Sequence, residues 1–283
     1  RERFGEDALR TLRAVRFAGQ LGFVIEEGTY NAIKELSDNI DKISAERIRV
    51  EITKLLISKG PDRMFVAKDT CLTRHFMPEW DKMCQEGYGD KIIKSINYIN
   101  EHISEEKRGQ REHKALCFAA LLMKSDNAKD VMKRLKFDNY SIEMVDRLAR
   151  LHDVEFATDK PSFRKFLNEA GVDIMPYLFE LRRAYFKGFY DDKDQSGKSL
   201  TDRDDEAENM LKEIMSAGDA IHVKDLKISG KDVMSHGVPA GKMVGIILNT
   251  LLEEVLENPE KNDEKFLVER AVELGDELSQ SNF

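Results

Sequence analysis

Residues 3–18 read RFGEDALRTLRAVRFA, and one periodicity runs through them. A carboxylate and three arginines recur at every third position, namely Asp7, Arg10, Arg13 and Arg16. On an α-helix each step of three residues displaces the side chain by about 60°, so the four charges sweep half of the circumference. Large apolar side chains fall within or beside this arc, at Leu9, Leu12 and Phe17. The pattern indicates a polar helix surface that is held rigid and partly enclosed.

Helical signals continue on the C-terminal side of this stretch. The first helix is expected over residues 7–21, with Gly22 as a left-handed cap. Thr29 is expected to cap a second helix. Ser44 is expected to cap a third helix, whose apolar residues recur on one face until Gly60. These three helices form a first unit.

Strand signals are nearly absent from the rest of the chain, and amphipathic helices recur. A Gly-Val-Pro-Ala-Gly turn at 237–241 is expected to open a long helix over 242–257. The sequence therefore predicts an all-α chain with three consecutive modules, at residues 1–60, 61–157 and 158–283.

The composition argues against a membrane-spanning, disulfide-linked or zinc-binding protein. The 283 residues carry a net charge of −8, and 35% of them are charged. The sequence has no apolar run long enough for a bilayer, no signal-peptide pattern, and three cysteines without CxxC spacing. We therefore expect a cytoplasmic protein without membrane, disulfide or zinc site. The charge is uneven, because residues 1–24 hold five Arg against three acids and residues 253–277 hold ten acids against three bases.

The first residue is Arg1, with no Met before it, and the strongest motif follows within twenty residues. We expect the sequence to be a piece of a longer protein.

The motif at residues 3–18 and the block after Ser44 resemble those of a known family. Residues 3–23, together with SAERIRVE at 44–51, closely resemble the neck of class II tRNA nucleotidyltransferases and bacterial poly(A) polymerases. In that family the Glu-Asp-x-x-Arg motif is a protein template for the incoming nucleotide. The resemblance implies that Asp7 and Arg10 read the base, while Arg13 and Arg16 support the nucleotide and its phosphates. It also implies that the all-α array is elongated and consists of neck, body and tail, without the β-sheet head.

The chemistry of such a template can be stated from the residue types. Cytosine and adenine present an amino donor beside a ring-nitrogen acceptor, whereas uracil and guanine present the opposite order. A carboxylate only accepts hydrogen bonds and a guanidinium only donates them. A fixed pair of Asp7 and Arg10 therefore fits C and A, and each group left unpaired against U or G costs about 1–3 kcal/mol.

The block that follows Ser44 is interpreted as mainly structural. The favoured interpretation is a capped helix with local salt bridges. The alternative is an ion-pair network of Glu46, Arg47, Arg49 and Glu51 that orients the template helix.

The resemblance also implies Mg²⁺, which the family binds with head carboxylates after a Gly-Gly-x-x-Arg-Asp turn and in an Asp-x-Asp pair. Neither pattern occurs here in a plausible context, since the acidic runs at 191–194 and 202–205 lie in a polar loop and an acidic helix start. We expect no metal site and no catalytic residue in this chain, which alone should not add nucleotides. Met123-Lys124 stands where related chains often have a His-Asp pair, so His113 is interpreted as an ordinary helix residue.

The expected partner is tRNA, whose upper half the body and tail would measure. The resemblance is specific in the first sixty residues, moderate at 228–260 and diffuse between them. Weak RNA-binding signals are Lys231 and Lys242, each beside a glycine turn that opens a helix. Further bases could follow an RNA backbone, although each taken singly is interpreted as an ordinary surface residue: Lys133, Arg134, Lys136, Arg147, Arg164, Lys165, Arg182 and Arg183. The oligomeric state has no signal in the sequence.

The favoured hypothesis is the C-terminal portion of an enzyme that adds CCA to tRNA 3′ ends from CTP and ATP. One alternative is a poly(A) polymerase, or an A-adding or C-adding enzyme of the same family. Others are a stand-alone helical RNA-binding module without catalysis, and a helical scaffold without RNA affinity.

Overall fold

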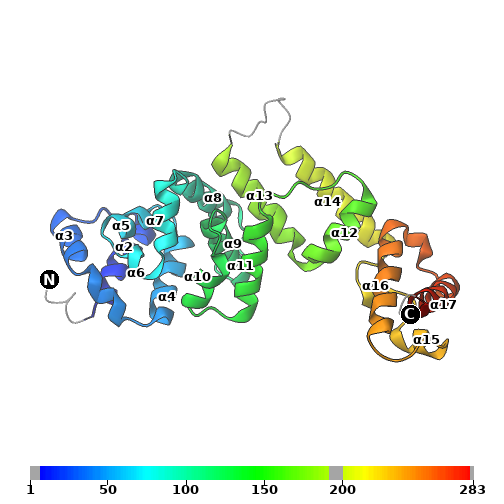
Figure 1. Cartoon of the computed structure of the whole chain (residues 1–283). Coiled ribbons are helices and arrows are strands. Elements are labelled where there is room, and N and C mark those ends of the chain that lie inside the picture. Colours follow the sequence, from blue (N-terminus) through cyan, green and yellow to red (C-terminus); the bar gives the residue numbers. More distant parts are fainter. Residues whose placement is uncertain (1–6, 191–199, 281–283) are drawn as a thin grey trace. The chain divides into compact units, whose positions relative to one another are not determined.

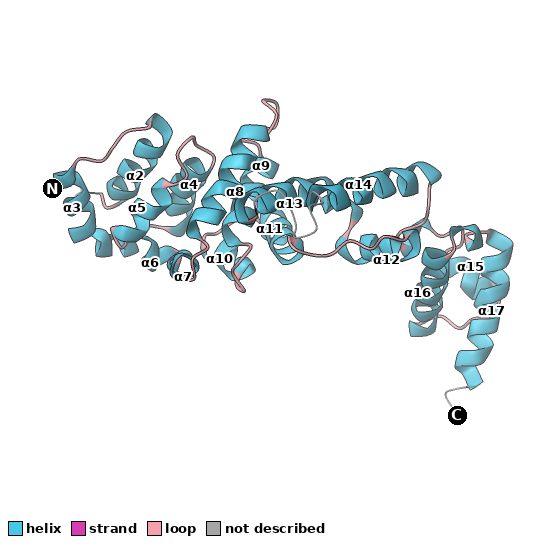
Figure 2. Cartoon of the chain, turned by 90° about the horizontal axis from the view of Figure 1, so that it is seen from above, coloured by secondary structure: helices cyan, strands magenta, loops and turns pink. Residues whose placement is uncertain are grey.

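The computed structural model describes residues 7–190 and 200–280, and every regular element among them is a helix (Figures 1 and 2). The α-helices are α2 Leu9–Leu21, α3 Glu27–Glu35, α4 Ala45–Leu56, α5 Arg63–Asp69, α6 Thr73–Phe76, α7 Pro78–Gln85, α8 Gly89–His102, α9 Arg111–Leu122, α10 Ala128–Arg134, α11 Asn139–Leu151, α12 Lys160–Ala170, α13 Met175–Phe189, α14 Leu200–Ala217, α15 Gly230–Ser235, α16 Lys242–Glu257 and α17 Glu264–Gln280. Short 3-10 helices are η1 Ser37–Lys42, η2 Val172–Ile174, η3 Val223–Asp225 and η4 Pro259–Lys261. The predicted all-α fold class is confirmed for these residues.

The chain folds into two compact units. The first consists of residues 1–154 and 174–201, and the second of residues 155–173 and 202–283. The chain therefore enters the second unit, returns to the first and leaves it again. The division into three modules that the sequence suggested, with boundaries at 60 and 157, stays a prediction.

In the first unit α2 packs along α4, and both helices contribute fully buried aliphatic side chains, among them Leu12, Val15 and Ile52. The helix α2 also lies very close to the turn after α4. A Cβ added to Gly19 would stand 2.6 Å from the carbonyl oxygen of Gly60. Only a residue without a side chain fits this contact, which fixes α2 against the turn.

The rest of the first unit is built around α9, which is apolar on all sides from Ala115 onwards. Its residues Ala115–Leu122 are all buried, as expected for a central helix. The helices α8 and α11 pack against α9, and α13 lies along α8 (Figure 1). A Cβ added to Gly188 of α13 would stand 2.2 Å from Oγ of Ser95 on α8. The close packing of these two helices depends on this glycine.

The helix ends test the sequence rules. The first helix ends at Gly22 with φ 69°, as predicted, although it begins at Leu9 rather than Asp7. The prediction for Thr29 is wrong, because the Glu26 carboxylate accepts the N–H groups of Gly28 and Thr29 and caps α3. A longer charged acceptor just before the helix takes the place of the hydroxyl. The long helix after the glycine turn spans the predicted range, Lys242–Glu257.

The second unit contains α12 and α14–α17, and α16 contacts α12, α15 and α17. Its buried apolar residues include Phe163, Leu167, Ile247 and Leu251. None of the helices in the described part of the chain has the length and apolar character needed to cross a bilayer.

Candidate nucleotide-reading site

Asp7 lies immediately before α2 and has two partners there. Its Oδ1 accepts the N–H of Leu9 at 3.1 Å, which satisfies a free donor of the first helical turn. Its Oδ2 accepts a hydrogen bond from Nη2 of Arg47 on α4 at 2.9 Å. The carboxylate is thereby fixed between two helices. Because a carboxylate has about four lone-pair positions, it can still accept a further donor.

The electrostatics keep Asp7 ionised. Partial burial raises its pKa, but the Leu9 N–H and the guanidinium groups of Arg47 and Arg13 outweigh this effect. The pKa of Asp7 therefore lies below its usual value of 3.8. At neutral pH this side chain acts as a hydrogen-bond acceptor only.

Arg13 and Arg16 share one buried carboxylate. Nε of Arg13 lies 3.3 Å from Oε1 of Glu51, and Nε of Arg16 lies 2.6 Å from Oε2. The contact of Arg16 is an ion pair without good hydrogen-bond geometry, although both atoms are buried. Arg16 also donates to Gln20 and lies over the Phe17 ring, 3.7 Å from its centroid. Glu51 thus connects two turns of α2 to α4.

Of the four residues singled out in the sequence, Asp7 lies just before α2 and the three arginines lie within it, but they differ in exposure. The side chain of Arg13 is 44% exposed, and that of Arg16 only 10%. Arg10 is half-buried and Asp7 is 26% exposed. The solvent-accessible edge therefore consists of Asp7, Arg10 and Arg13, with Arg16 beneath it.

The ion-pair network, which the sequence left as the alternative, is present for two of its four members. Arg47 reaches Asp7, and Glu51 reaches both Arg13 and Arg16. Arg49 points elsewhere, with its guanidinium 5.3 Å from the centroid of the Phe137 ring.

A buried polar link that the sequence did not reveal connects α4 to α8 and α9. His113 Nδ1 accepts the N–H of Gly109 at 2.9 Å, so its Nε2 carries the proton and donates to Oδ1 of Asn100 at 2.8 Å. The Asn100 amide donates to the carbonyl oxygens of Leu56 and Ser58. Burial lowers the pKa of His113 to about 4, with smaller effects from nearby cations. His113 is a structural residue of the helix junction.

Lys124 and His152 form a second cluster in the first unit. Nζ of Lys124 donates to Nε2 of His152 at 2.8 Å and lies 3.7 Å from Asp153. The His152 ring packs edge-on against Tyr185, and burial lowers the pKa of this histidine. Lys124 therefore interacts with a neutral imidazole.

No group of three or more His, Cys, Asp or Glu side chains in the described ranges is arranged to hold a metal ion. The acidic run at 202–205 lies in the first turns of α14, as expected from the sequence. The run at 191–194 lies outside the described residues.

Two of the basic residues proposed for RNA contact lie in the interior of the fold. Arg164 and Arg182 are buried, which contradicts their use as backbone-tracking surface charges. Arg164 binds Asp219 and two carbonyl groups, and Arg182 donates to the carbonyl oxygens of His152 and Val154. These side chains hold the fold together.

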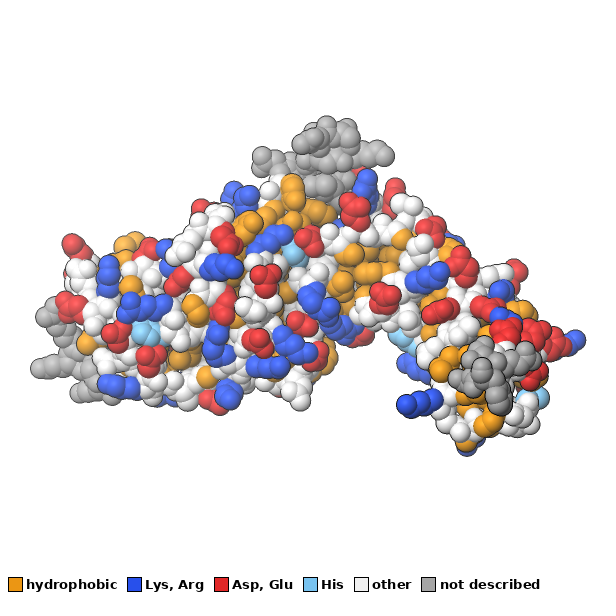
Figure 3. All heavy atoms as spheres, in the orientation of Figure 1, with side chains coloured by type: hydrophobic (Ala, Val, Ile, Leu, Met, Phe, Trp, Pro, Cys, Tyr) orange, Lys and Arg blue, Asp and Glu red, His pale blue; other side chains and the backbone are white. Residues whose placement is uncertain are grey.

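The two lysines proposed for RNA binding are exposed members of the second unit. Lys231 lies in the short helix α15, whose N-terminus is capped by a capping box of Ser229 and Asp232. Lys242 is the first residue of α16. Figure 3 shows acidic side chains gathered over α17, and basic and acidic side chains interspersed over the helices of the first unit.

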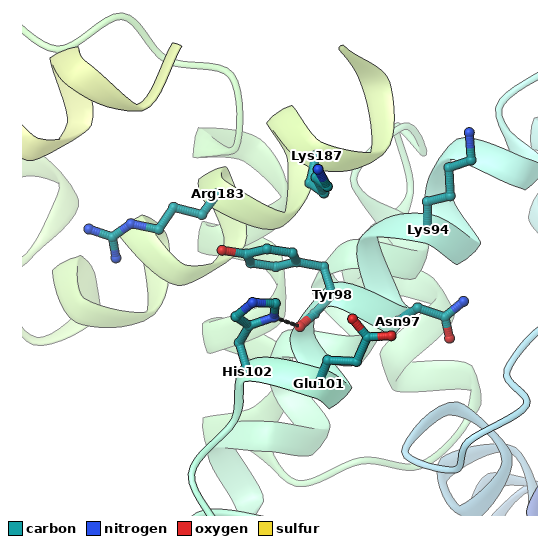
Figure 4. Close-up of a pocket in the computed structure, with 7 residues that line it drawn as sticks. All are labelled: Lys94, Asn97, Tyr98, Glu101, His102, Arg183 and Lys187. Atoms are coloured by element: carbon teal, nitrogen blue, oxygen red, sulfur yellow. Dashed lines mark hydrogen bonds between the residues drawn. The ribbon is translucent and has the colours of Figure 1, made fainter. Parts of the chain in front are cut away.

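A surface pocket of about 490 Å³ lies between α8 and α13 in the first unit (Figure 4). The rings of Tyr98 and His102 stack in it, with centroids 3.9 Å apart. Lys94, Arg183 and Glu101 are further lining residues. The pocket combines an aromatic pair with charges of both signs.

The comparisons with known proteins agree across the chain. Residues 22–84 match the family model described as "Probable RNA and SrmB- binding site of polymerase A", and residues 195–271 match "tRNA nucleotidyltransferase domain 2". A CCA-adding enzyme of Ligilactobacillus salivarius is 31% identical over 277 residues, which are 98% of this chain and 62% of that protein. A CCA-adding enzyme of Limosilactobacillus reuteri is 57% identical over 60 residues, which are 21% of this chain and 15% of that protein.

A solved structure has the same fold. The Bacillus stearothermophilus CCA-adding enzyme, crystallised in complex with CTP, superimposes with a TM-score of 0.71 at 22% identity. The match covers all of this chain and 65% of that one. The chain thus spans about three fifths of the length of the curated relatives that it matches along most of its own length. Motif, fold and relatives together show that this chain belongs to the family of CCA-adding tRNA nucleotidyltransferases and poly(A) polymerases.

Proposed function

We propose that this chain is the neck, body and tail of an enzyme that adds CCA to the 3′ end of tRNA, using CTP and ATP. Within that enzyme it selects the incoming base and binds tRNA. The relatives of similar sequence along most of the chain are CCA-adding enzymes, which favours this activity over the other members of the family.

One observation carries the assignment of base selection. The ionised Asp7 is fixed by α2 on one side and by Arg47 of α4 on the other, one helical turn before Arg10. A base-reading edge must keep its donor and acceptor in place, since a group that can rotate would satisfy any base. The contacts of Glu51 with Arg13 and Arg16 hold the two helices in register beneath this edge.

The roles follow from what each group can donate or accept. Asp7 accepts from the amino group of cytosine or adenine, and Arg10 donates to the adjacent ring nitrogen. Arg13, which is more exposed, supports the nucleotide phosphates, and Arg16 supports the site through Glu51. Against uracil or guanine, acceptor would face acceptor and donor would face donor.

Metal-assisted transfer is assigned to another part of the enzyme. The family binds Mg²⁺ through carboxylates, and the described residues of this chain do not fit such a site. The contribution of this chain is selection of the base and contact with tRNA, for which Lys231 and Lys242 are candidate residues.

The test is product analysis with the full-length protein and a tRNA that lacks CCA, in the presence of all four nucleoside triphosphates. We expect CCA ends from the wild type, and misincorporated U or G from Asp7→Ala and Arg10→Ala. A matched control is Asp38→Ala, because Asp38 is an exposed carboxylate of the first unit that also pairs with an arginine. Unchanged selection in both site variants would contradict the proposal.

The same experiment separates the alternatives. Long A tails would show a poly(A) polymerase, and single C or A additions would show a partial enzyme. A stand-alone RNA-binding module would bind RNA with no effect of Asp7→Ala or Arg10→Ala.

A further inference from the structure

A second pocket in the first unit lies between α4, the N-terminal end of α9 and the connection from α10 to α11. It has a volume of about 650 Å³, within the range of nucleotide-sized ligand sites. Its lining residues come from three segments, around Arg49–Ile57, Gly109–Ala115 and Met132–Ser141. We call it the α4–α9 pocket.

The charge of this pocket is opposite to that of the chain. Its basic residues are Arg49, Lys54, Arg111, Lys114 and Lys136, and its one acidic residue is Asp138. Asp138 pairs with Arg111 and caps α11 through the N–H of Ser141. Glu46 is near enough to act on Lys136 and Arg49, but it does not line the pocket. A net excess of positive charge in a chain of charge −8 indicates an anionic ligand.

The pocket also has an apolar part. Phe137 packs edge-on against the buried Phe118, with ring centroids 4.8 Å apart, and the Arg49 guanidinium lies over the Phe137 ring. Val50, which lines the same pocket, is 41% exposed. Flat guanidinium and aromatic groups are the surfaces on which proteins stack unpaired RNA bases.

Lys136 has an unusual backbone conformation at the pocket. It has φ 57°, in the left-handed region, where it ends α10 in a Schellman motif. The N–H of Phe137 donates to the carbonyl of Met132, and the N–H of Lys136 donates to that of Lys133. Glycine is the usual residue at such a position, because a side chain there costs about 1 kcal/mol. The lysine places a cation in the pocket at the expense of stability.

The pocket of Figure 4 is less suited to a phosphate. It contains Glu101 beside its cations, and Arg183 and Lys187 already have interactions of their own. In the α4–α9 pocket no ion pair is recorded within the described residues for Lys54, Lys114 or Lys136.

We propose that the α4–α9 pocket binds one unpaired nucleotide of an RNA strand. Lys54, Lys114 and Lys136 contact its backbone phosphates, and the base stacks against Arg49 and Phe137. The proposal rests on the proposed function in that it names where the tRNA-binding surface takes up a single-stranded nucleotide.

The experiment measures binding of the 283-residue chain to a fluorescent single-stranded RNA of about ten nucleotides, by anisotropy at several salt concentrations. The test variant carries Lys54→Glu, Lys114→Glu and Lys136→Glu. The control carries Lys34→Glu, Lys42→Glu and Lys82→Glu, three exposed lysines of the same unit outside the pocket. Both variants change the net charge equally, and circular dichroism checks that both are folded.

We expect the test variant to bind at least about tenfold more weakly than the control. The slope of log affinity against log salt should fall by about 0.7 for each lost phosphate contact. Arg49→Lys, which keeps the charge but loses the planar group, should also weaken binding of the oligonucleotide. Equal weakening in test and control variants would overturn the proposal, as would wild-type affinity in the test variant.

Free CMP and inorganic phosphate are added as competitors to identify the source of the phosphate. Displacement of the RNA only at millimolar concentrations supports a strand-binding site. If CMP binds tightly and the RNA does not bind, the pocket is a mononucleotide site and the proposal falls. CCA addition by the full-length protein is a separate readout. If the full-length protein does not add CCA, the proposed function is refuted but the pocket proposal is not. If the triple variant binds RNA with wild-type affinity, only the pocket proposal is refuted.

Discussion

At the scale of single residues, Arg47 shows how Asp7, the carboxylate that we propose reads the base, is fixed. It donates to Asp7 across the gap between α4 and α2, and nearly half of its side chain is exposed. Exposed ion pairs of this kind contribute about 1 kcal/mol or less to stability. The contact therefore matters mainly for the position of Asp7.

The first prediction is that Arg47 affects base selection more than it affects stability. Arg47→Ala in the full-length protein should lower the preference for CTP and ATP over UTP and GTP by about tenfold, equivalent to 1.4 kcal/mol. The free energy of unfolding should change by about 1 kcal/mol or less. Arg47→Lys should restore part of the preference, because it keeps the charge without the planar fork. Loss of stability without loss of selection would make Arg47 purely structural.

The second prediction concerns His113, whose pKa falls from 6.5 to about 4 on burial. The folded state holds this histidine neutral, so its contribution to stability is complete above pH 6.5 and declines as the pH falls towards 4. The full difference corresponds to about 3 kcal/mol. Urea unfolding at several pH values should show this decline in the wild type. In His113→Gln the decline should be smaller, with the remainder coming from groups such as His152, whose pKa burial also lowers. A decline equal to that of the wild type would contradict the neutral structural role.

The sequence could indicate the residues that we propose read the base, but it could not indicate the residues that hold them in place. Asp7 and Arg10 stand out because their spacing and chemistry are local. The partners Arg47 and Glu51 lie about forty residues away, and only packing selects them from the many charged residues. Asn100 and His113 carry no signal of their own, since their role depends on the carbonyl groups that packing brings near.

At the scale of elements, helix ends were predictable where a glycine fixes them. Gly22 and the turn at 237–241 specify where helices end or begin whatever the surrounding fold. Burial of basic residues was not predictable. Arg164 and its neighbour Lys165 look alike in sequence, but Arg164 faces α16 and is buried while Lys165 remains exposed.

The third prediction concerns this arginine. Its Nε and Nη2 donate to the carbonyl groups of Leu256 and Glu257 at the end of α16, and Nη1 pairs with Asp219. Arg164→Ala leaves these groups unpaired and should destabilise the second unit by about 3–5 kcal/mol. Arg164→Lys should lose most of the same contacts. Lys165→Ala is the matched control. Thermal unfolding should give Lys165→Ala a midpoint close to that of the wild type, and both Arg164 variants a lower one.

The fourth prediction concerns the end of α10. Lys136→Gly should stabilise the protein by about 1 kcal/mol, because glycine adopts positive φ without strain. The same exchange at Lys133, inside the helix, should instead destabilise it by up to about 1 kcal/mol. Urea unfolding compares the two variants. Equal destabilisation by both changes would show that Lys136 is not strained.

At the scale of the whole molecule, composition alone would have argued against an RNA-binding protein. The net charge is −8, yet acidic residues concentrate towards the C-terminal end, and the α4–α9 pocket is basic. The sequence showed the first of these facts but not the second. The pocket is lined by three segments, none of which has a distinctive sequence pattern, and only the tertiary fold brings them together.

The central proposal is that this chain binds tRNA, and equilibrium binding by the chain tests it most directly. The measurement compares tRNA, tRNA lacking CCA and an unrelated RNA of equal length at several salt concentrations. We expect preference for both tRNAs over the unrelated RNA, with affinity that falls steeply as salt rises. Absence of binding at low salt, or equal affinity for all three RNAs, would contradict the claim and leave only the base-reading site of the neck.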